Sequence, residues 1–248
     1  CGGFDRYFQI AKCLRDEDLR ADRQPEFTQI DVEMAFVDQD DVFKVAETML
    51  QRVWYDSLGL SVSVPFERLP HAEALERFGT DKPDLRISWE LSDFTHTLTD
   101  IGFGIFDAVV AAGGRVRGIV VKGGTVLSRS RINHYDELAQ EVGAKGVIWL
   151  KRVESGWSGP LAKVVGEATS DELEATHGVE EGDLVFLVAG RDEETAPALD
   201  LIRRRVAREL DAIDEGQDRW LWITEFPLFY KDPETGLPVH AQHAFTMP

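Results

Sequence analysis

Cysteines, long apolar runs and basic residues are all scarce in this chain of 248 residues. Its two cysteines, Cys1 and Cys13, are too few for a disulfide framework and lie in no metal-ligand spacing, so we expect reduced thiols. No run approaches the roughly 18 apolar residues that a membrane-spanning helix needs. No basic segment leads into an apolar stretch at the start, as a secretory signal would require. These absences favour a cytoplasmic protein.

The shortage of basic residues also limits the possible partners. Lysine and arginine number 27 against 45 aspartates and glutamates, which gives a formal net charge of −18. Proteins that hold nucleic acids through their phosphates usually carry a basic face. We therefore expect no binding of DNA and none of anionic membranes. Any contact with RNA must be local and guided by bases or shape.

Two kinds of ligand-binding motif are also missing. The glycine pairs at 113–114 and 123–124 open no helix with a GxGxxG or P-loop pattern, so we interpret them as turns. His240 and His243 lie close together, but without a nearby cysteine or an HExxH pattern. We therefore predict no metal site from these residues.

What is present indicates a globular α+β protein, with 43% apolar and 29% charged residues. Alternation over 7–14 and 26–37 predicts a β-hairpin. One face of its second strand is apolar, whereas the other carries Phe27, Gln29, Asp31 and Glu33. This second face could be the floor of a ligand cleft or an ordinary solvated sheet surface, and the pattern alone leaves both open.

Helical periodicity and glycine punctuation organise the rest of the chain. Apolar residues at helical spacing over 42–54 predict a core-facing helix, capped by Asp40 or Asp41 and ended by Gly59. From about 91 to 190, short β-rich runs alternate with helical stretches, which indicates a separate insert with its own small core. A second helix is predicted over 195–213. The pattern favours the arginines at 203–205 as its solvated flank over an RNA-binding patch.

The residues around Arg15 carry a family resemblance. Residues 4–31 contain FDRYFQIAKC and then RDEDLRADRQPEFTQID, which closely resembles motif 2 of the bacterial-type aspartyl-tRNA synthetases, a class II family. Three further stretches agree: GTDKPDLR at 79–86, GAKG at 143–146, and FP at 226–227 running to HAFT at 243–246. The resemblance spans essentially the whole chain.

The resemblance implies a partial class II catalytic core built on an antiparallel sheet, with an inserted α+β domain of the GAD type. Residues 1–90 would begin the catalytic domain, 91–190 would form the insert, and 191–248 would return to the catalytic domain. Motif 1 and the anticodon-binding domain would precede this chain, and motif 3 would follow it. We therefore expect a piece of a longer polypeptide that is inactive alone.

The implied activity is the ATP-dependent activation of L-aspartate and its transfer to the 3′ end of tRNA(Asp). Mg²⁺ would arrive with ATP, and the whole enzyme would be a homodimer. Arg15 would bridge the substrate carboxylate and the α-phosphate, as a planar bidentate cation can. The resemblance also assigns ATP contacts to Asp16, Glu17, Gln24 and Phe27, aspartate contacts to Gln29, Asp31 and His243, and contacts with the tRNA acceptor end to Leu19, Arg20, Ala21 and Asp22.

The sequence departs from the family near its end, where Gln242 replaces one of two paired histidines and Ala244 replaces a proline. Two other functions remain possible: an enzyme that also charges tRNA(Asn), and a non-catalytic paralogue that binds RNA or protein. The joint presence of four residues argues against the paralogue, which has no need of them: Arg15, Glu17, Phe27 and Asp31. A metal-dependent hydrolase fails for want of a ligand cluster.

Overall fold

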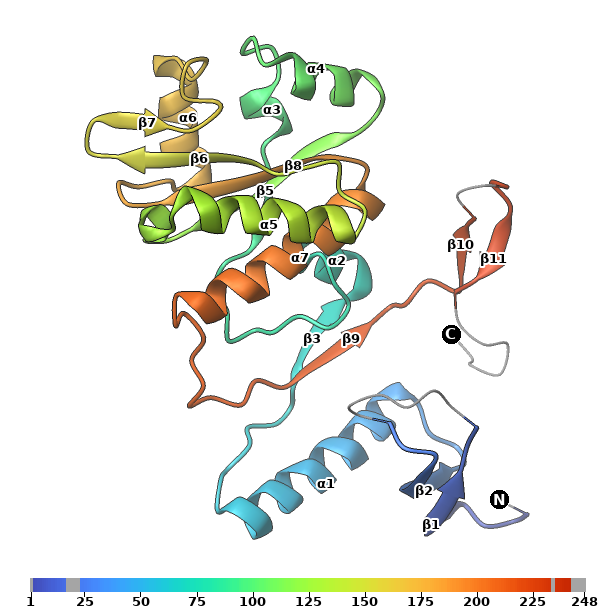
Figure 1. The fold of residues 1–248 in the computed structure, drawn as a ribbon. Helices are drawn as coiled ribbons and strands as arrows, with labels where there is room; N and C mark the ends of the chain where they lie inside the picture. The colour runs from blue at the N-terminus through green and yellow to red at the C-terminus, as the bar shows by residue number, and fades with distance from the viewer. Residues whose placement is uncertain (1, 17–22, 233–234, 242–248) are drawn as a thin grey trace. The chain divides into compact units, whose positions relative to one another are not determined.

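The computed structural model describes residues 2–16, 23–232 and 235–241, and it divides the chain into two compact units, Cys1–Phe66 and Glu67–Pro248 (Figure 1). Helices and mainly antiparallel strands are mixed, which confirms the predicted α+β class. None of the described helices is long and apolar enough to cross a membrane. Glu17, the segment 19–22 and His243 lie outside the described residues.

The first unit begins with a two-stranded antiparallel hairpin, β1 (Arg6–Leu14) and β2 (Glu26–Met34). Successive side chains of a strand point to opposite faces, so alternating apolar and polar residues favour this structure. The register pairs Phe8 with Val32 and Ile10 with Ile30, which places the apolar residues of both strands on one face. The predicted hairpin is thereby confirmed.

The apolar face of this hairpin is largely uncovered by the rest of its unit. Ile10 is 63% exposed and Ile30 is 52% exposed. The apolar stripe of the following helix is also open, with Val45 and Met49 both exposed. Within the described residues the stripe is only partly covered, since Ala46, Leu50 and Trp54 are half-buried. A two-stranded hairpin and one helix are too few elements to enclose both surfaces.

Helix α1 (Gln39–Leu58) follows the hairpin and has well-defined ends. Its cap is Asp38, which accepts a hydrogen bond from the Asp41 N–H at 3.2 Å while the Asp41 side chain accepts one from Asp38. The predicted cap, Asp40 or Asp41, was two or three residues too late, and Asp41 is instead the second member of this capping box. Gly59 ends the helix at φ +69°, as predicted.

A five-stranded antiparallel sheet forms the centre of the second unit. Its strand order is β4 (Leu91–Asp93), β5 (Arg115–Val121), β8 (Leu184–Gly190), β6 (Ile148–Val153) and β7 (Gly156–Ser158). Helices α5 (Arg129–Glu141) and α7 (Asp192–Glu209) pack on one face. Helices α3 (Thr95–Leu98), α4 (Gly104–Ala111) and α6 (Glu167–His177) cover the other (Figure 1). A short 3₁₀ turn, η1 (Gly124–Val126), follows β5.

Strand β8 explains why this sheet has two cores. Leu184, Phe186 and Val188 point to the core beneath α5 and α7, whereas Val185 and Leu187 point to the core beneath α3, α4 and α6. All five are at most 1% exposed. A strand that is buried on both faces has an unbroken apolar sequence, and the strand predicted at 185–188 is confirmed.

Helix α7 completes one of these cores although it lies after the predicted insert. Leu199, Ile202 and Val206 are fully buried and belong to the same cluster as Ile119 and Phe186 of the sheet. Residues 91–190 therefore do not form this core without α7.

Arg203 lies on the buried side of α7 and is 0% exposed. Its Nε donates to the carbonyl oxygen of Trp89 at 2.6 Å, and its Nη2 donates to those of Asp84 at 2.9 Å and Ile87 at 2.8 Å. The prediction that the arginines at 203–205 form a solvated flank is therefore wrong for Arg203. Residues three apart lie on the same side of a helix, so the helical period places Arg203 on the side of the buried Val206.

The segments that lead into and out of the five-stranded sheet, 82–86 and 217–219, lie next to each other, and we call this pair of segments the neck. Before the sheet come β3 (Glu67–Pro70) and α2 (His71–Phe78), and after it comes β9 (Leu221–Thr224), which pairs with β3 in parallel. Segments 82–86 and 217–219 line one cavity of about 370 Å³, so the outgoing and returning segments are neighbours. A hairpin of β10 (Phe229–Lys231) and β11 (Pro238–His240) follows.

His177, at the end of α6, gives a testable pH dependence. Its ring stacks on Phe94, with centroids 3.8 Å apart, and its Nε2 lies 2.9 Å from the Thr97 hydroxyl. Burial lowers the pKa of His177 below its ordinary value of 6.5. The unfolded chain therefore binds more protons below about pH 7, so the free energy of unfolding should decrease as the pH falls through the folded-state pKa.

We expect the ¹³Cε1 shift of His177, assigned by its loss in His177→Gln, to titrate below pH 6.5. The loss of stability between pH 7.5 and 5.5 should be smaller in this variant. Titration at or above 6.5 would contradict the prediction.

Candidate functional site

The second face of the β1–β2 hairpin brings the predicted site residues together. The register sets Cys13 opposite Phe27, Ala11 opposite Gln29, and Gln9 opposite Asp31. Gln9 is exposed, whereas Ala11, Cys13, Phe27, Gln29 and Asp31 are all half-buried, in contrast to the open apolar face. Small side chains on β1 thus face larger polar and aromatic ones on β2, as a ligand-binding floor requires.

Two hydrogen bonds cross this floor between the strands. The Gln9 amide Nε2 donates to Oδ2 of Asp31 at 3.0 Å, which orients that carboxylate. The thiol of Cys13, a free cysteine, lies 3.6 Å from Oε1 of Gln29. The second contact is weak because sulfur is a poor donor.

Arg15 lies just beyond the end of β1 and extends the ladder by one bond, since its N–H donates to the Pro25 carbonyl at 2.8 Å. Its guanidinium lies over the Phe27 ring, with Cζ 5.3 Å from the ring centroid. This cation–π contact shows that Arg15 points to the same face as Phe27. Asp16 and Gln24 are exposed next to it, at the two ends of the connecting loop.

The order of the side chains along this face determines which ligand groups it can bind. A cation and an aromatic ring, Arg15 and Phe27, lie at the loop end, an amide lies in the middle at Gln29, and a carboxylate lies at Asp31. Such a row can hold an anion at one end and an ammonium at the other. Rigid paired strands keep the row in place.

Sequence reasoning missed Gln9 as a partner of the site. The alternation puts Gln9 on the correct face, but its bond to Asp31 depends on the register between strands 22 residues apart in the chain. If the register between the two strands had been known, the contact of Gln9 with Asp31 could have been predicted, because directly opposed side chains on paired strands touch each other. No sequence signal at Gln9 alone indicates this role.

Among residues 2–16, 23–232 and 235–241, no three histidine, cysteine, aspartate or glutamate side chains gather in a way that could hold a metal ion. On this face of β2, Asp31 and Glu33 lie two positions apart, opposite Gln9 and Tyr7 of β1.

Comparison with known proteins gives a consistent picture. The sequence family described as tRNA synthetases class II (D, K and N) matches residues 1–248. The chain is 44% identical, over all 248 residues, to aspartate–tRNA(Asp/Asn) ligases of Bacillus mycoides, Bacillus cereus and Bacillus anthracis. It covers 42% of the length of each of these relatives.

Proposed function

The chain belongs to the class II tRNA synthetases of the D, K and N group, and on this premise we propose that the whole protein is an aspartate–tRNA ligase. It would join L-aspartate to ATP as aspartyl-adenylate and transfer the aspartyl group to tRNA(Asp). The observation that carries the proposal is the identity of 44% over the entire chain to aspartate–tRNA(Asp/Asn) ligases. Because those relatives are named for both tRNAs, we include tRNA(Asn) as a second substrate.

Arg15 has the central role in the proposed activation step. The aspartate carboxylate attacks the α-phosphorus, a new C–O–P linkage forms, and pyrophosphate leaves. Two anions must approach each other, and a planar guanidinium can hold both through parallel hydrogen bonds. The position of Arg15 at the loop end of a half-buried face supports this role.

The other groups of the hairpin face would bind the two substrates. Arg15 occupies one face of the Phe27 ring, so adenine would stack on the other. Asp31, oriented by Gln9, would accept the substrate ammonium, and Gln29 would hydrogen-bond beside it. Further proposed contacts are ATP to Asp16, Glu17 and Gln24, aspartate to His243, and the tRNA acceptor end to residues 19–22, of which Glu17, His243 and 19–22 lie outside the described residues.

Mg²⁺ would accompany ATP through the phosphate oxygens. The described residues offer no cluster of metal ligands, so we assign no step of the reaction to a metal held by them. We also propose that the whole enzyme is a cytoplasmic homodimer.

The test is amino-acid-dependent exchange of pyrophosphate into ATP by the whole protein. We expect exchange with L-aspartate and none with L-asparagine or L-lysine, the other two substrates of this synthetase group. Exchange with asparagine or lysine in place of aspartate would contradict the proposal. Charging of purified tRNA(Asp) and tRNA(Asn) transcripts then decides whether both tRNAs are substrates.

We also propose that the insertion into the catalytic domain includes α7 as well as the predicted 91–190. Support comes from the shared core of α7 and the sheet, and from the neck where 82–86 and 217–219 lie together. Removal of 91–190 alone would take away the sheet on which the buried face of α7 packs.

Two deletions in the whole protein test these bounds. Removal of 91–190 should yield misfolded protein, because the buried face of α7 would lose its sheet. Removal of 87–216 with a short glycine–serine linker should leave a folded protein that still exchanges pyrophosphate. Solubility, circular dichroism and exchange are the measurements. A soluble, active 91–190 deletion would show that the insertion ends before α7.

A further inference from the structure

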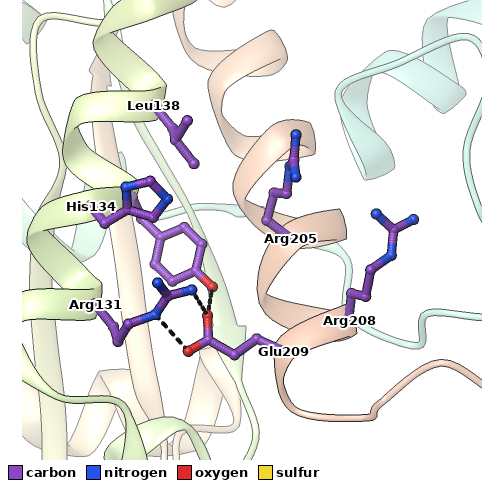
Figure 2. Close-up of a pocket in the computed structure, with 7 residues that line it drawn as sticks. Arg131, His134, Leu138, Arg205, Arg208 and Glu209 are labelled. Atoms are coloured by element: carbon purple, nitrogen blue, oxygen red, sulfur yellow. Dashed lines mark hydrogen bonds and ion pairs between the residues drawn. The ribbon is translucent and has the colours of Figure 1, made fainter.

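A cavity of about 550 Å³ lies between α5 and α7, outside the hairpin and outside the neck (Figure 2). Its lining is unusually basic for a chain with a net charge of −18. The residues that line it are Arg131, His134, Tyr135 and Leu138 of α5, and Arg205, Arg208 and Glu209 of α7. The lining contains three arginines and one carboxylate. Its formal charge is therefore +2 when histidine is not counted.

The one carboxylate of the cavity is already satisfied. Glu209 accepts hydrogen bonds from Nε of Arg131 at 2.8 Å and from Nη2 at 2.6 Å, and the Tyr135 hydroxyl also donates to it. The Arg131 guanidinium holds the pKa of Glu209 below its usual range, while burial and Glu209 raise the pKa of Tyr135 to about 12. Arg131, Tyr135 and Glu209 therefore form a closed group. Figure 2 shows the contacts between Arg131 and Glu209 as dashed lines.

Arg205 and Arg208 are different, because neither side chain makes an ion pair or a hydrogen bond within the described part of the chain. Both are exposed, one turn apart on α7, and Figure 2 shows their guanidiniums extending away from the group around Glu209. Elsewhere in this unit, Arg77, Arg115 and Arg152 all pair with carboxylates. In so acidic a chain, two unpaired arginines at one cavity stand out.

From this arrangement we propose that the cavity between α5 and α7 binds a phosphate group through Arg205 and Arg208. Guanidiniums bind phosphate oxygens through paired, charge-assisted hydrogen bonds. The closed pairing of Glu209 removes the charge that would otherwise repel an anion. The phosphate could come from an RNA backbone or from a small phosphorylated molecule, and both present the same group to the arginines.

The test uses the whole protein with Arg205→Gln and Arg208→Gln combined. Arg129→Gln is the matched control, because Arg129 is an exposed arginine at the start of α5 that does not line the cavity. Binding of a tRNA(Asp) transcript is measured by filter retention across a range of salt concentrations. Binding of inorganic phosphate is measured by the NMR signals of the arginine Nε–H groups.

If RNA supplies the phosphate, the double variant should bind the transcript about tenfold or more weakly. Its slope of log K against log salt should decrease by about 1 for each lost contact. If a small molecule supplies it, transcript binding should stay unchanged, while millimolar phosphate shifts the Arg205 and Arg208 signals. The control should match the wild type in both assays. Unchanged transcript binding together with unshifted signals would overturn the proposal.

The outcome can be separated from that of the proposed ligase activity. Neither arginine lies on the hairpin face, so pyrophosphate exchange should be the same in wild type and double variant. Failure of exchange in the wild type would refute the ligase proposal without affecting the binding data.

Discussion

Replacing Arg15 with alanine in the whole protein should slow formation of aspartyl-adenylate by about 10²–10³-fold, the effect of losing one preorganised charge-stabilising donor. The Arg15 guanidinium is anchored over Phe27 at the loop end of the half-buried face. Its contacts to two anions strengthen as the new bond forms, so the loss should affect the rate more than ground-state binding. The measurement is single-turnover adenylate formation at saturating ATP and aspartate.

Two further variants make this result specific. Arg15→Lys should recover only part of the rate, because an ammonium keeps the charge but cannot make two parallel hydrogen bonds. Lys12→Ala is the matched control: Lys12 is on the same strand but on the opposite face, where it pairs with Glu26 at 2.7 Å. It should react at the wild-type rate. A wild-type rate in Arg15→Ala would remove Arg15 from the site.

The largest effect on stability is expected from Arg203→Ala. Arg203 is fully buried, donates to three backbone carbonyls, and lies over the Phe78 ring at 5.0 Å. Truncation removes the arginine donor from all three carbonyls, of which that of Asp84 still accepts from the Ile87 N–H, and it opens a cavity beneath α7. We expect a loss of about 3–5 kcal/mol in the free energy of unfolding, the range for breaking a buried charged network. Urea unfolding followed by circular dichroism measures it.

The neighbouring Arg205 provides the comparison for this measurement. Arg205 is exposed and makes no ion pair with another described residue, so Arg205→Ala should change the free energy of unfolding by less than about 0.5 kcal/mol. Arg203→Lys should be nearly as harmful as Arg203→Ala, since one ammonium cannot reach three carbonyls that a planar guanidinium spans. Similar losses at 203 and 205 would show that Arg203 has no special structural role.

Local patterns were enough to predict several elements. Period-two alternation gave the hairpin and put Arg15 and Phe27 on one face, and the contact between them agrees. Helical periodicity with a glycine stop gave the end of α1 at Gly59. These signals are local because each depends on residues within one strand or one helical turn.

Contacts between distant segments could not be predicted in this way. Arg203 looks like its two neighbours in sequence, and only the carbonyls of 84–89, more than a hundred positions earlier, make its burial favourable. The closed pairing of Arg131 with Glu209 likewise depends on how α5 packs against α7. The roles of Arg15, Gln29 and Asp31 toward substrates stay predictions, because they depend on ligands as well as on fold.

The parallel pairing of β3 with β9 has a consequence for how the chain folds. Glu67 pairs with Leu221, so these strands meet only after everything between them has been brought together. Closing so long a loop from a disordered chain is entropically costly, and such distant pairings slow folding. The neck removes most of this cost, because a folded insertion already holds 82–86 beside 217–219. The five-stranded sheet and its helices should therefore form first, and the β3–β9 pair should form late in folding.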